Sequence, residues 1–284
     1  MPFEVATLAD LQKVGSGDDG WTRFADYVQV ADIDASDTET WNWNESRSVY
    51  EGFMPIRPDP GTPFAGFYKG MGYKVTGLHI DRLVQFVGLF GAVSNAVHDL
   101  YVENFNISRP DSGSNTAVGG VCGAVFSNGN ITRCGASGSV SGTLYTGGVC
   151  GMLSGVMERC FSDTVVMSGA FGSAGSLIGR FWGGQVTDCY AKGSVDGAYN
   201  NGGLIGISNG SVSNCFSVAQ VSTGDQETGG LIALKESDGT VTNSFWDIEA
   251  SGQSWSDGGT GLTTAQMQDI ATFSGAGWDI HEHD

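Results

Sequence analysis

The sequence repeats itself with a period of about 27 residues, and this repeat restricts the fold more than any other feature. A short apolar stretch bounded by small residues recurs six times, and we call it the first motif. Its copies begin at Gly88, Gly120, Gly148, Ser176, Gly203 and Gly230. Periods of roughly 20 to 50 residues are typical of proteins in which each repeat buries its apolar face against its neighbours.

Two further motifs lie within each repeat. The second motif is Gly-x-apolar-x-x-Cys, whose cysteines are Cys134, Cys160, Cys189 and Cys215. A fifth copy has Ser244 in place of the cysteine. The third motif is a valine six residues beyond each cysteine, as at Val140 and Val195. Three short apolar segments per repeat, each interrupted by glycine, predict strands rather than helices.

We therefore predict an all-β chain that folds as a right-handed parallel β-helix (β-solenoid), with about three short strands per coil of about 27 residues. Equivalent positions of successive coils should stack about 4.8 Å apart and form ladders of like side chains. We expect an N-terminal cap and lead-in strands over 1–85, the repeats over 86–247 and a C-terminal cap with a short helix over 248–284.

Both ends of a solenoid expose strand edges and need caps, and the sequence supplies helix signals for both. Thr7 is a candidate N-cap for a helix through Leu8, Leu11 and Val14. Thr263 or Thr264 is a candidate N-cap for a helix over 265–270, and Phe273 beyond it can close the apolar core.

The formal net charge of -18 arises from a shortage of bases, since 13 Lys and Arg face 31 Asp and Glu. Such a surface repels phosphate groups, so we expect no nucleic-acid partner. No run of 18 apolar residues is present, which predicts that the chain does not span a membrane. The first residues lack the pattern of a secretory signal, so we expect either that a signal was removed and replaced by a start Met or that the protein leaves the cell by another route, such as release inside a viral particle.

The six cysteines occupy repeat positions, which favours buried core thiols that behave as small hydrophobic groups. One or two disulfides and a metal site remain as alternatives, although no Cys-x-x-Cys pair is present. Acidic residues of the repeats lie singly in different coils, mostly in turns, whereas most glycoside hydrolases need two carboxyl groups close together. We therefore expect no enzyme activity, and a polysaccharide-degrading β-helix enzyme stays an alternative.

Exposed aromatic rings are the best binding candidates, because they contact sugar faces and protein partners well. The candidates are Trp21, Trp41, Trp43, Tyr50 and Trp182. The alternative is that these rings plug the solenoid. Asp32, Asp34 and Asp37 are candidate calcium ligands, the only cofactor considered, although alternation around Ile33 suits a strand equally well.

The repeat resembles the GLUG-motif family of glycine-rich proteins. The resemblance rests on Gly-Gly-Leu-Ile-Gly at 202–206, on the Gly-x-Val-x-x-Cys step, and on the endings at 251–254 and 261–267. It covers nearly the whole chain and implies a β-helix with attachment roles, as in surface adhesins and some viral proteins, and it implies no catalytic residues.

We expect a non-enzymatic structural or attachment protein that displays a binding surface on a rigid rod. The first hypothesis is a virion component at the virion surface (a capsid decoration, tail or fibre protein). Its partners would be other virion proteins or a host-surface glycan or protein, and the chain would form a homotrimer. The alternative is a bacterial or archaeal adhesin domain at the cell surface.

Overall fold

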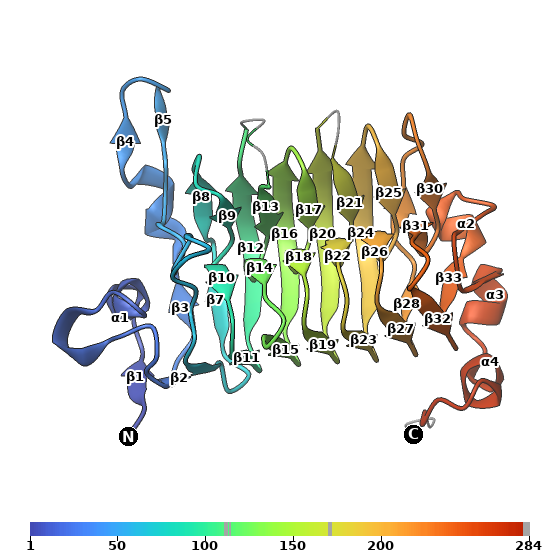
Figure 1. The fold of residues 1–284 in the computed structure, drawn as a ribbon, viewed down its shortest axis with the longest axis horizontal. Coiled ribbons are helices and arrows are strands. Elements are labelled where there is room, and N and C mark those ends of the chain that lie inside the picture. Colours follow the sequence, from blue (N-terminus) through green and yellow to red (C-terminus); the bar gives the residue numbers. More distant parts are fainter. Residues whose placement is uncertain (111–112, 114, 170–171, 281–284) are drawn as a thin grey trace.

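The computed structural model describes residues 1–110, 113, 115–169 and 172–280, and it confirms the predicted parallel β-solenoid (Figure 1). Successive coils stack along one long axis, and every pairing between strands of neighbouring coils is parallel within the described residues, with a register shift between Glu103 and Phe105. Figure 1 shows the stack between an N-terminal end in blue and a C-terminal end in red.

Four sheets run along the stack. In stacking order, the nine-stranded sheet contains β1 (Phe3–Val5), β2 (Tyr27–Gln29), β6 (Phe67–Lys69), β11 (Ala96–His98), β15 (Asn130–Thr132), β19 (Val156–Glu158), β23 (Gln185–Thr187), β27 (Ser211–Ser213) and β32 (Thr240–Thr242). The eleven-stranded sheet contains β3 (Ile33–Asp34), β7 (Lys74–Thr76), β8 (His79–Asp81), β12 (Tyr101–Ser108), β16 (Gly135–Gly142), β20 (Phe161–Ser168), β24 (Tyr190–Gly197), β28 (Phe216–Ser217), β29 (Gln220–Val221), β33 (Phe245–Asp247) and β34 (Thr260–Leu262).

The other two long sheets have six strands each. One contains β10 (Phe90–Val93), β14 (Cys122–Val125), β18 (Cys150–Leu153), β22 (Ile178–Phe181), β26 (Ile205–Ser208) and β31 (Ile232–Lys235). The other contains β9 (Phe86–Val87), β13 (Ala117–Gly119), β17 (Tyr145–Gly147), β21 (Ser173–Gly175), β25 (Asn200–Gly202) and β30 (Thr228–Gly229).

Each complete coil thus contains four strands, where about three were expected. The first motif is bent into two strands, so that β13 and β14 belong to different sheets and meet at Gly120 and Val121. Val121 is fully buried at this corner. A Cβ on Gly120 would overlap the Phe105 ring, so glycine is required for the chain to turn there.

Inward side chains form the expected ladders. One ladder is fully buried and consists of Leu89, Val121, Val149, Leu177, Leu204 and Leu231. Burial of each such side chain is worth about 1.5–3 kcal/mol. A second ladder contains Cys134, Cys160, Cys189 and Cys215. All six cysteines are free and buried, as the repeat positions predicted.

Helical caps close both ends. At the N-terminal end, α1 (Leu8–Lys13) begins at Thr7, whose side chain accepts the Asp10 N–H in a capping box. Two 3₁₀ turns, η1 (Asp18–Gly20) and η2 (Ser36–Thr40), follow it. At the C-terminal end lie α2 (Ile248–Ser251), α3 (Thr264–Met267) and α4 (Ile270–Gly275). The helix expected over 265–270 is divided, because Asp269 caps α4 by accepting the Ala271 N–H.

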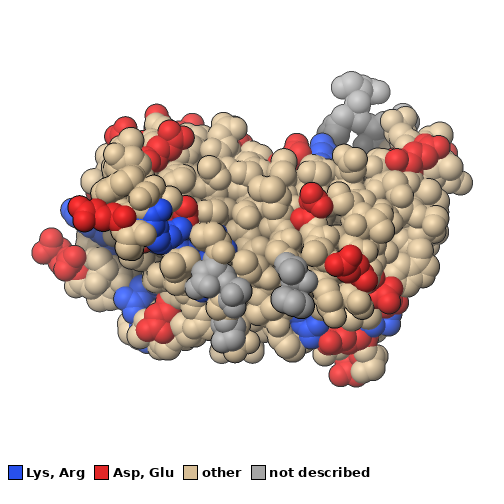
Figure 2. All heavy atoms as spheres, turned by 90° about the horizontal axis from the view of Figure 1, so that it is seen from above, with Lys and Arg blue, Asp and Glu red and all other residues tan. Residues whose placement is uncertain are grey.

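A two-stranded antiparallel hairpin, β4 (Trp43–Asn44) and β5 (Val49–Tyr50), projects from the N-terminal end (Figure 1). Seen from above, much of the surface is uncharged, and acidic side chains lie on it in separate groups (Figure 2). Within the described part of the chain, no helix is both long enough and apolar enough to cross a membrane.

Candidate binding site at the N-terminal end

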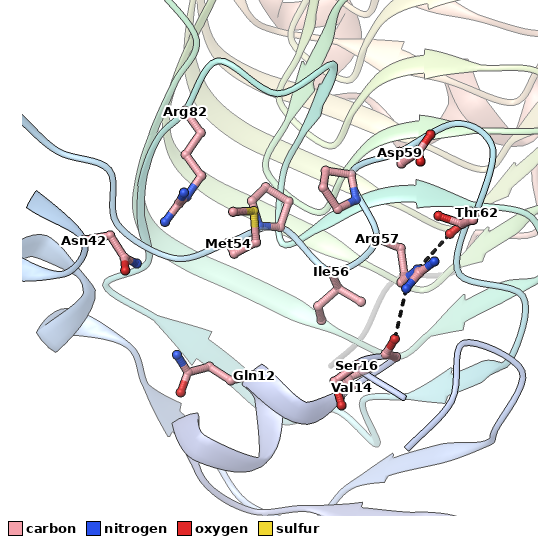
Figure 3. Close-up of a pocket in the computed structure, with 13 residues that line it drawn as sticks. Gln12, Val14, Ser16, Asn42, Met54, Ile56, Arg57, Asp59, Thr62 and Arg82 are labelled. Carbon is pink, nitrogen blue, oxygen red and sulfur yellow. Dashed lines mark hydrogen bonds between the residues drawn. The ribbon is translucent and has the colours of Figure 1, made fainter. Parts of the chain in front are cut away.

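A cavity of about 570 Å³ lies at the N-terminal end, between α1, the chain before the hairpin and the segment 54–62 (Figure 3). Proline and the residue before it avoid helical conformations, so Pro55 and Pro58 exclude a helix here, and Arg57 has a left-handed backbone with φ of 55°. Its backbone pairs with the edge of β10: the Ile56 N–H donates to the Leu89 carbonyl oxygen at 2.9 Å, and the Gly91 N–H donates to the Ile56 carbonyl oxygen at 2.7 Å.

Arg57 is the main cationic group of this cavity. Its Nε donates to the Thr62 carbonyl oxygen at 2.8 Å, and its Nη1 donates to the Gly15 carbonyl oxygen at 3.3 Å. No carboxylate of the described residues lies within ion-pair distance of this guanidinium. Two neutral carbonyl groups therefore orient Arg57. The Asp59 carboxylate also lines the cavity, but it accepts the Gly61 N–H at 2.9 Å and lies outside ion-pair distance of Arg57.

Arg82 lies on the other side of Met54 and Ile56 from Arg57 (Figure 3). Its Nε and Nη2 donate to the carbonyl oxygens of Phe53 and Gly52 at 2.9 and 2.8 Å, and its Nη1 contacts Glu51 Oε2 at 2.9 Å. Burial lowers the pKa of Arg82, and the charge of Glu51 opposes that effect. Because Glu51 neutralises Arg82, Arg57 remains the group of this cavity that can attract an anion.

The hairpin brings two of the five aromatic candidates together. Trp43 and Tyr50 are 53% and 41% exposed, and their ring centroids are 5.0 Å apart in an edge-to-face arrangement. Asn42, which precedes Trp43, lines the cavity, and its Nδ2 donates to the Gly52 carbonyl oxygen at 2.8 Å. Arg47 lies in the turn of the hairpin, and its ion pairs with Asp81 and Glu51 tie this turn to the end of β8. The exposed rings are therefore presented beside the cavity on an anchored arm.

The other three aromatic candidates lie elsewhere. The Trp21 ring packs 4.8 Å from Phe3 and 5.5 Å from Tyr27, and Trp41 is partly buried against the core. Trp182 is 44% exposed, far along the chain at the end of β22, where the Arg180 guanidinium lies 4.0 Å above its ring. Trp21 and Trp41 thus pack against other side chains at the N-terminal end. This agrees with the alternative that the aromatic rings plug the solenoid.

The three aspartates are not brought together into one site. Asp32 Oδ1 accepts the Lys74 N–H at 2.9 Å, and Asp34 Oδ1 accepts the Ser36 N–H at 2.9 Å. The latter bond lowers the pKa of the exposed Asp34. Among the described residues, no three His, Cys, Asp or Glu side chains are grouped so that they could hold a metal ion. Asp32 and Asp34 instead satisfy backbone N–H groups near β3.

Sequence reasoning did not single out Arg57 or Arg82. A signal was available, because Arg57 lies between two prolines in a chain with only 13 bases. Its importance depends on a carbonyl group of Gly15, 42 residues earlier, which no local pattern indicates.

Comparisons with known proteins place the chain beside long proteins of bacteria and archaea. It is 31% identical over 285 residues to "Halomucin" of Haloquadratum walsbyi, an alignment that covers 95% of this chain and 3% of that protein. It is 37% identical over 118 residues to a "Putative Gly-rich membrane protein" of Evansella cellulosilytica, covering 41% of this chain and 11% of that protein. The chain thus spans only a small part of either relative.

No protein-family model matches the sequence, so the GLUG resemblance stays an interpretation. Among solved structures, a putative immunoglobulin A1 protease from Bacteroides ovatus aligns with a TM-score of 0.73 at 16% identity, covering 94% of this chain and 85% of that one. An IgA1 protease aligns with a TM-score of 0.50 at 12% identity, covering 98% of this chain and 24% of that one. At such low identity these neighbours support the β-helix fold alone.

Proposed function

We propose that this chain is a non-enzymatic attachment module of a cell-surface or extracellular protein. We further propose that its N-terminal cavity binds a carboxylate group of an extracellular polymer. The observation that carries the proposal is the Arg57 guanidinium, which lines the cavity without an acidic partner among the described residues. Arginine binds carboxylates through parallel N–H···O bonds, so a carboxylate is the group that suits this position.

The geometry supports recognition rather than catalysis. The two carbonyl groups that hold Arg57 fix its orientation before a ligand arrives, which reduces the entropic cost of binding. Trp43 and Tyr50 offer apolar ring surface beside the cavity, which suits the non-polar faces of a sugar unit. A polymer with a carboxylate on its sugar units combines both features.

The location at a surface is supported by the relatives, one of which is named a membrane protein. Both relatives favour the cell-surface alternative over the virion component that was our first hypothesis from sequence. The GLUG resemblance, with its attachment roles, agrees with this choice. The fold of the protease neighbours does not by itself argue for enzyme activity, since one fold hosts many functions.

The test is direct binding of polygalacturonate and alginate, with uncharged dextran as the reference polymer. Arg57→Gln should lower the affinity for both acidic polymers about tenfold or more, because a bond to a charged group is worth about 1.5–3 kcal/mol. The matched control is Arg23→Gln. The Arg23 guanidinium also donates to a carbonyl oxygen, that of Pro63 at 2.9 Å, and the substitution removes the same charge outside the cavity.

Three outcomes would contradict the proposal. Equal losses in Arg57→Gln and Arg23→Gln would indicate a general charge effect. Absence of binding to either acidic polymer would exclude the carboxylate site. New reducing ends or unsaturated sugars after incubation would establish an enzyme. Antibody labelling of intact cells and of purified virus particles from the source culture separates the two locations.

A further inference from the structure

A second surface follows the corner between the nine-stranded and eleven-stranded sheets. One residue per coil has a left-handed backbone there, with φ between 47 and 55°, and these residues form a polar corner ladder: Asp99, Arg133, Arg159, Asp188, Asn214 and Asn243. Two positions later, each coil except the one with Gly135 carries an aromatic residue, and these form an aromatic ladder: Tyr101, Phe161, Tyr190, Phe216 and Phe245.

The two ladders run side by side into a pocket of about 500 Å³. Arg159, Asp188 and Asn214 line it from the corner ladder, and Tyr190 and Phe216 line it from the aromatic ladder. Trp278 closes the C-terminal end of the pocket. Its Nε1 donates to the Asn243 carbonyl oxygen at 2.9 Å, and its ring packs 5.1 Å from Phe273 of α4.

The rings of the aromatic ladder present edges rather than faces to the pocket. Tyr190 and Phe216 are stacked with centroids 5.2 Å apart and an interplanar angle of 7°, so their faces cover each other. Trp278 is tilted by 45° to Phe216, so its ring lies across the end of the stack. The pocket therefore has apolar C–H edges on one side and an indole ring at its end.

The polar groups of the pocket suit hydroxyl groups. Arg159 supplies donors, Asp188 supplies acceptors, and Asn214 supplies both while its Nδ2 donates to Asp188 Oδ1 at 3.2 Å. Tyr190 is partly buried and lines the pocket, and its hydroxyl can both donate and accept a hydrogen bond. Arg159 pairs with Glu158 at 3.4 Å and with Asp188 at 3.9 Å, and Asp279 also lines the pocket, so the lining has no excess of positive charge and suits a ligand without acidic groups.

We infer that this pocket binds the end of a neutral, linear oligosaccharide. Its hydroxyl groups bond to the corner ladder and to Tyr190, and its non-polar ring faces contact Trp278 and the edges of the aromatic ladder. A repeating polymer suits this surface because equivalent side chains recur about every 4.8 Å along the solenoid. The site shares no residue with the N-terminal cavity, so either proposal can fail without the other.

The test is calorimetric titration with cello-, manno- and chito-oligosaccharides graded in length. At least one series should bind, with an affinity that rises with length and then levels off as the pocket and the adjoining ladders are filled. Tyr190→Phe should lower the affinity about fivefold, since it removes one hydrogen bond of about 1 kcal/mol and keeps the ring in its stack. Trp278→Ala should lower the affinity about tenfold or more.

Trp255→Ala is the matched control, because Trp255 is 47% exposed at the same end of the chain and lies outside the pocket. If Trp278→Ala loosens the C-terminal cap, Tyr190→Phe still tests the site. Failure of all three series to bind would overturn the inference, as would binding that Tyr190→Phe and Trp278→Ala leave unchanged. Dimerisation that Trp278→Ala abolishes, without sugar binding, would assign the pocket to a second copy of the chain and likewise overturn it.

Discussion

Tyr101 and Phe161 lie two coils apart in the stack, yet their ring centroids are only 5.8 Å apart. The residue between them in register is Gly135. Two coil steps correspond to about 9.6 Å of backbone separation, so the rings lean together over the glycine. A side chain at Gly135 would occupy the space in which they meet.

Gly135→Ala should therefore destabilise the solenoid. A Cβ there would overlap both rings, and overpacking of this kind costs about 1–3 kcal/mol. Gly275→Ala is the matched control, because no atom lies within 4 Å of a Cβ at that position. The measurement is the urea midpoint of unfolding for both variants. Equal midpoints would mean that the two rings separate freely and that the gap at Gly135 has no packing role.

The cysteine ladder has a hydrogen-bonding role that its repeat positions alone do not indicate. Cys160 Sγ accepts the backbone N–H of Cys134 at 3.4 Å, and Cys189 Sγ accepts that of Cys160 at 3.3 Å. At the end of the ladder, Ser244 Oγ accepts the Cys215 N–H at 3.1 Å. This explains why serine can replace cysteine there: both side chains satisfy a buried N–H of the preceding coil.

Cys160→Ala should be more destabilising than Cys160→Ser. Alanine leaves the buried Cys134 N–H without an acceptor, which costs about 1–3 kcal/mol, whereas serine keeps an acceptor. Denaturant unfolding of the two variants measures the difference. If Cys160→Ala is as stable as Cys160→Ser or more stable, the thiol acts only as a small apolar group, and the N–H···S contact contributes nothing to stability.

The fold was predictable because its stabilising contacts recur with the period of the sequence. Leu177, Leu204 and Leu231 stack on one another because they occupy equivalent positions of successive repeats. The buried residues of one repeat therefore predict the buried residues of the next. The bend at Gly120 and Val121 was not predictable, since one continuous apolar motif encodes two strands. Strands β1 and β2 were not predictable either, because Phe3 pairs with Tyr27 and the residues between them contain none of the repeat motifs.

The candidate site was less predictable than the fold, because its contacts are unique. Trp43 and Tyr50 were identified as exposed aromatic residues, but their pairing depends on a hairpin that no repeat defines. Arg57 depends on carbonyl groups from two separate segments. A polar contact made once leaves no periodic trace in the sequence.

Stability should fall with rising pH above about pH 8.5, the ordinary pKa of a free cysteine. Burial raises the pKa values of Cys122, Cys134, Cys160 and Cys189 well above that value. Above pH 8.5 the unfolded chain loses thiol protons that the folded chain retains, so each such group lowers the free energy of unfolding by up to about 1.4 kcal/mol per pH unit. Below pH 8.5 both the folded and the unfolded chain keep these thiol protons, so the thiols cause no loss of stability there.

Urea midpoints measured at pH 7 and across the alkaline range test this dependence. Cys160→Ser should reduce the slope of the free energy of unfolding against pH by the equivalent of about one proton, because serine does not titrate in this range. Thiol labelling offers a second measurement, and we expect the native protein to react much more slowly than the unfolded chain. A stability that stays flat up to pH 10, or fast labelling of the native state, would contradict burial of these thiols.

Salt should strengthen, rather than weaken, binding of an acidic polymer at Arg57. The protein carries a net charge of -18, so at low salt its long-range field repels the polymer, whereas the attraction to Arg57 acts at contact. The screening length falls from about 30 Å at 0.01 M to about 8 Å at 0.15 M salt. This removes most of the long-range repulsion but little of the short-range attraction between the carboxylate and Arg57. Affinity for polygalacturonate should therefore rise between these concentrations and fall again near 1 M. A steady decrease from the lowest salt would show that the ligand meets a broad basic surface, which this chain of 13 bases and 31 acids does not provide at Arg57.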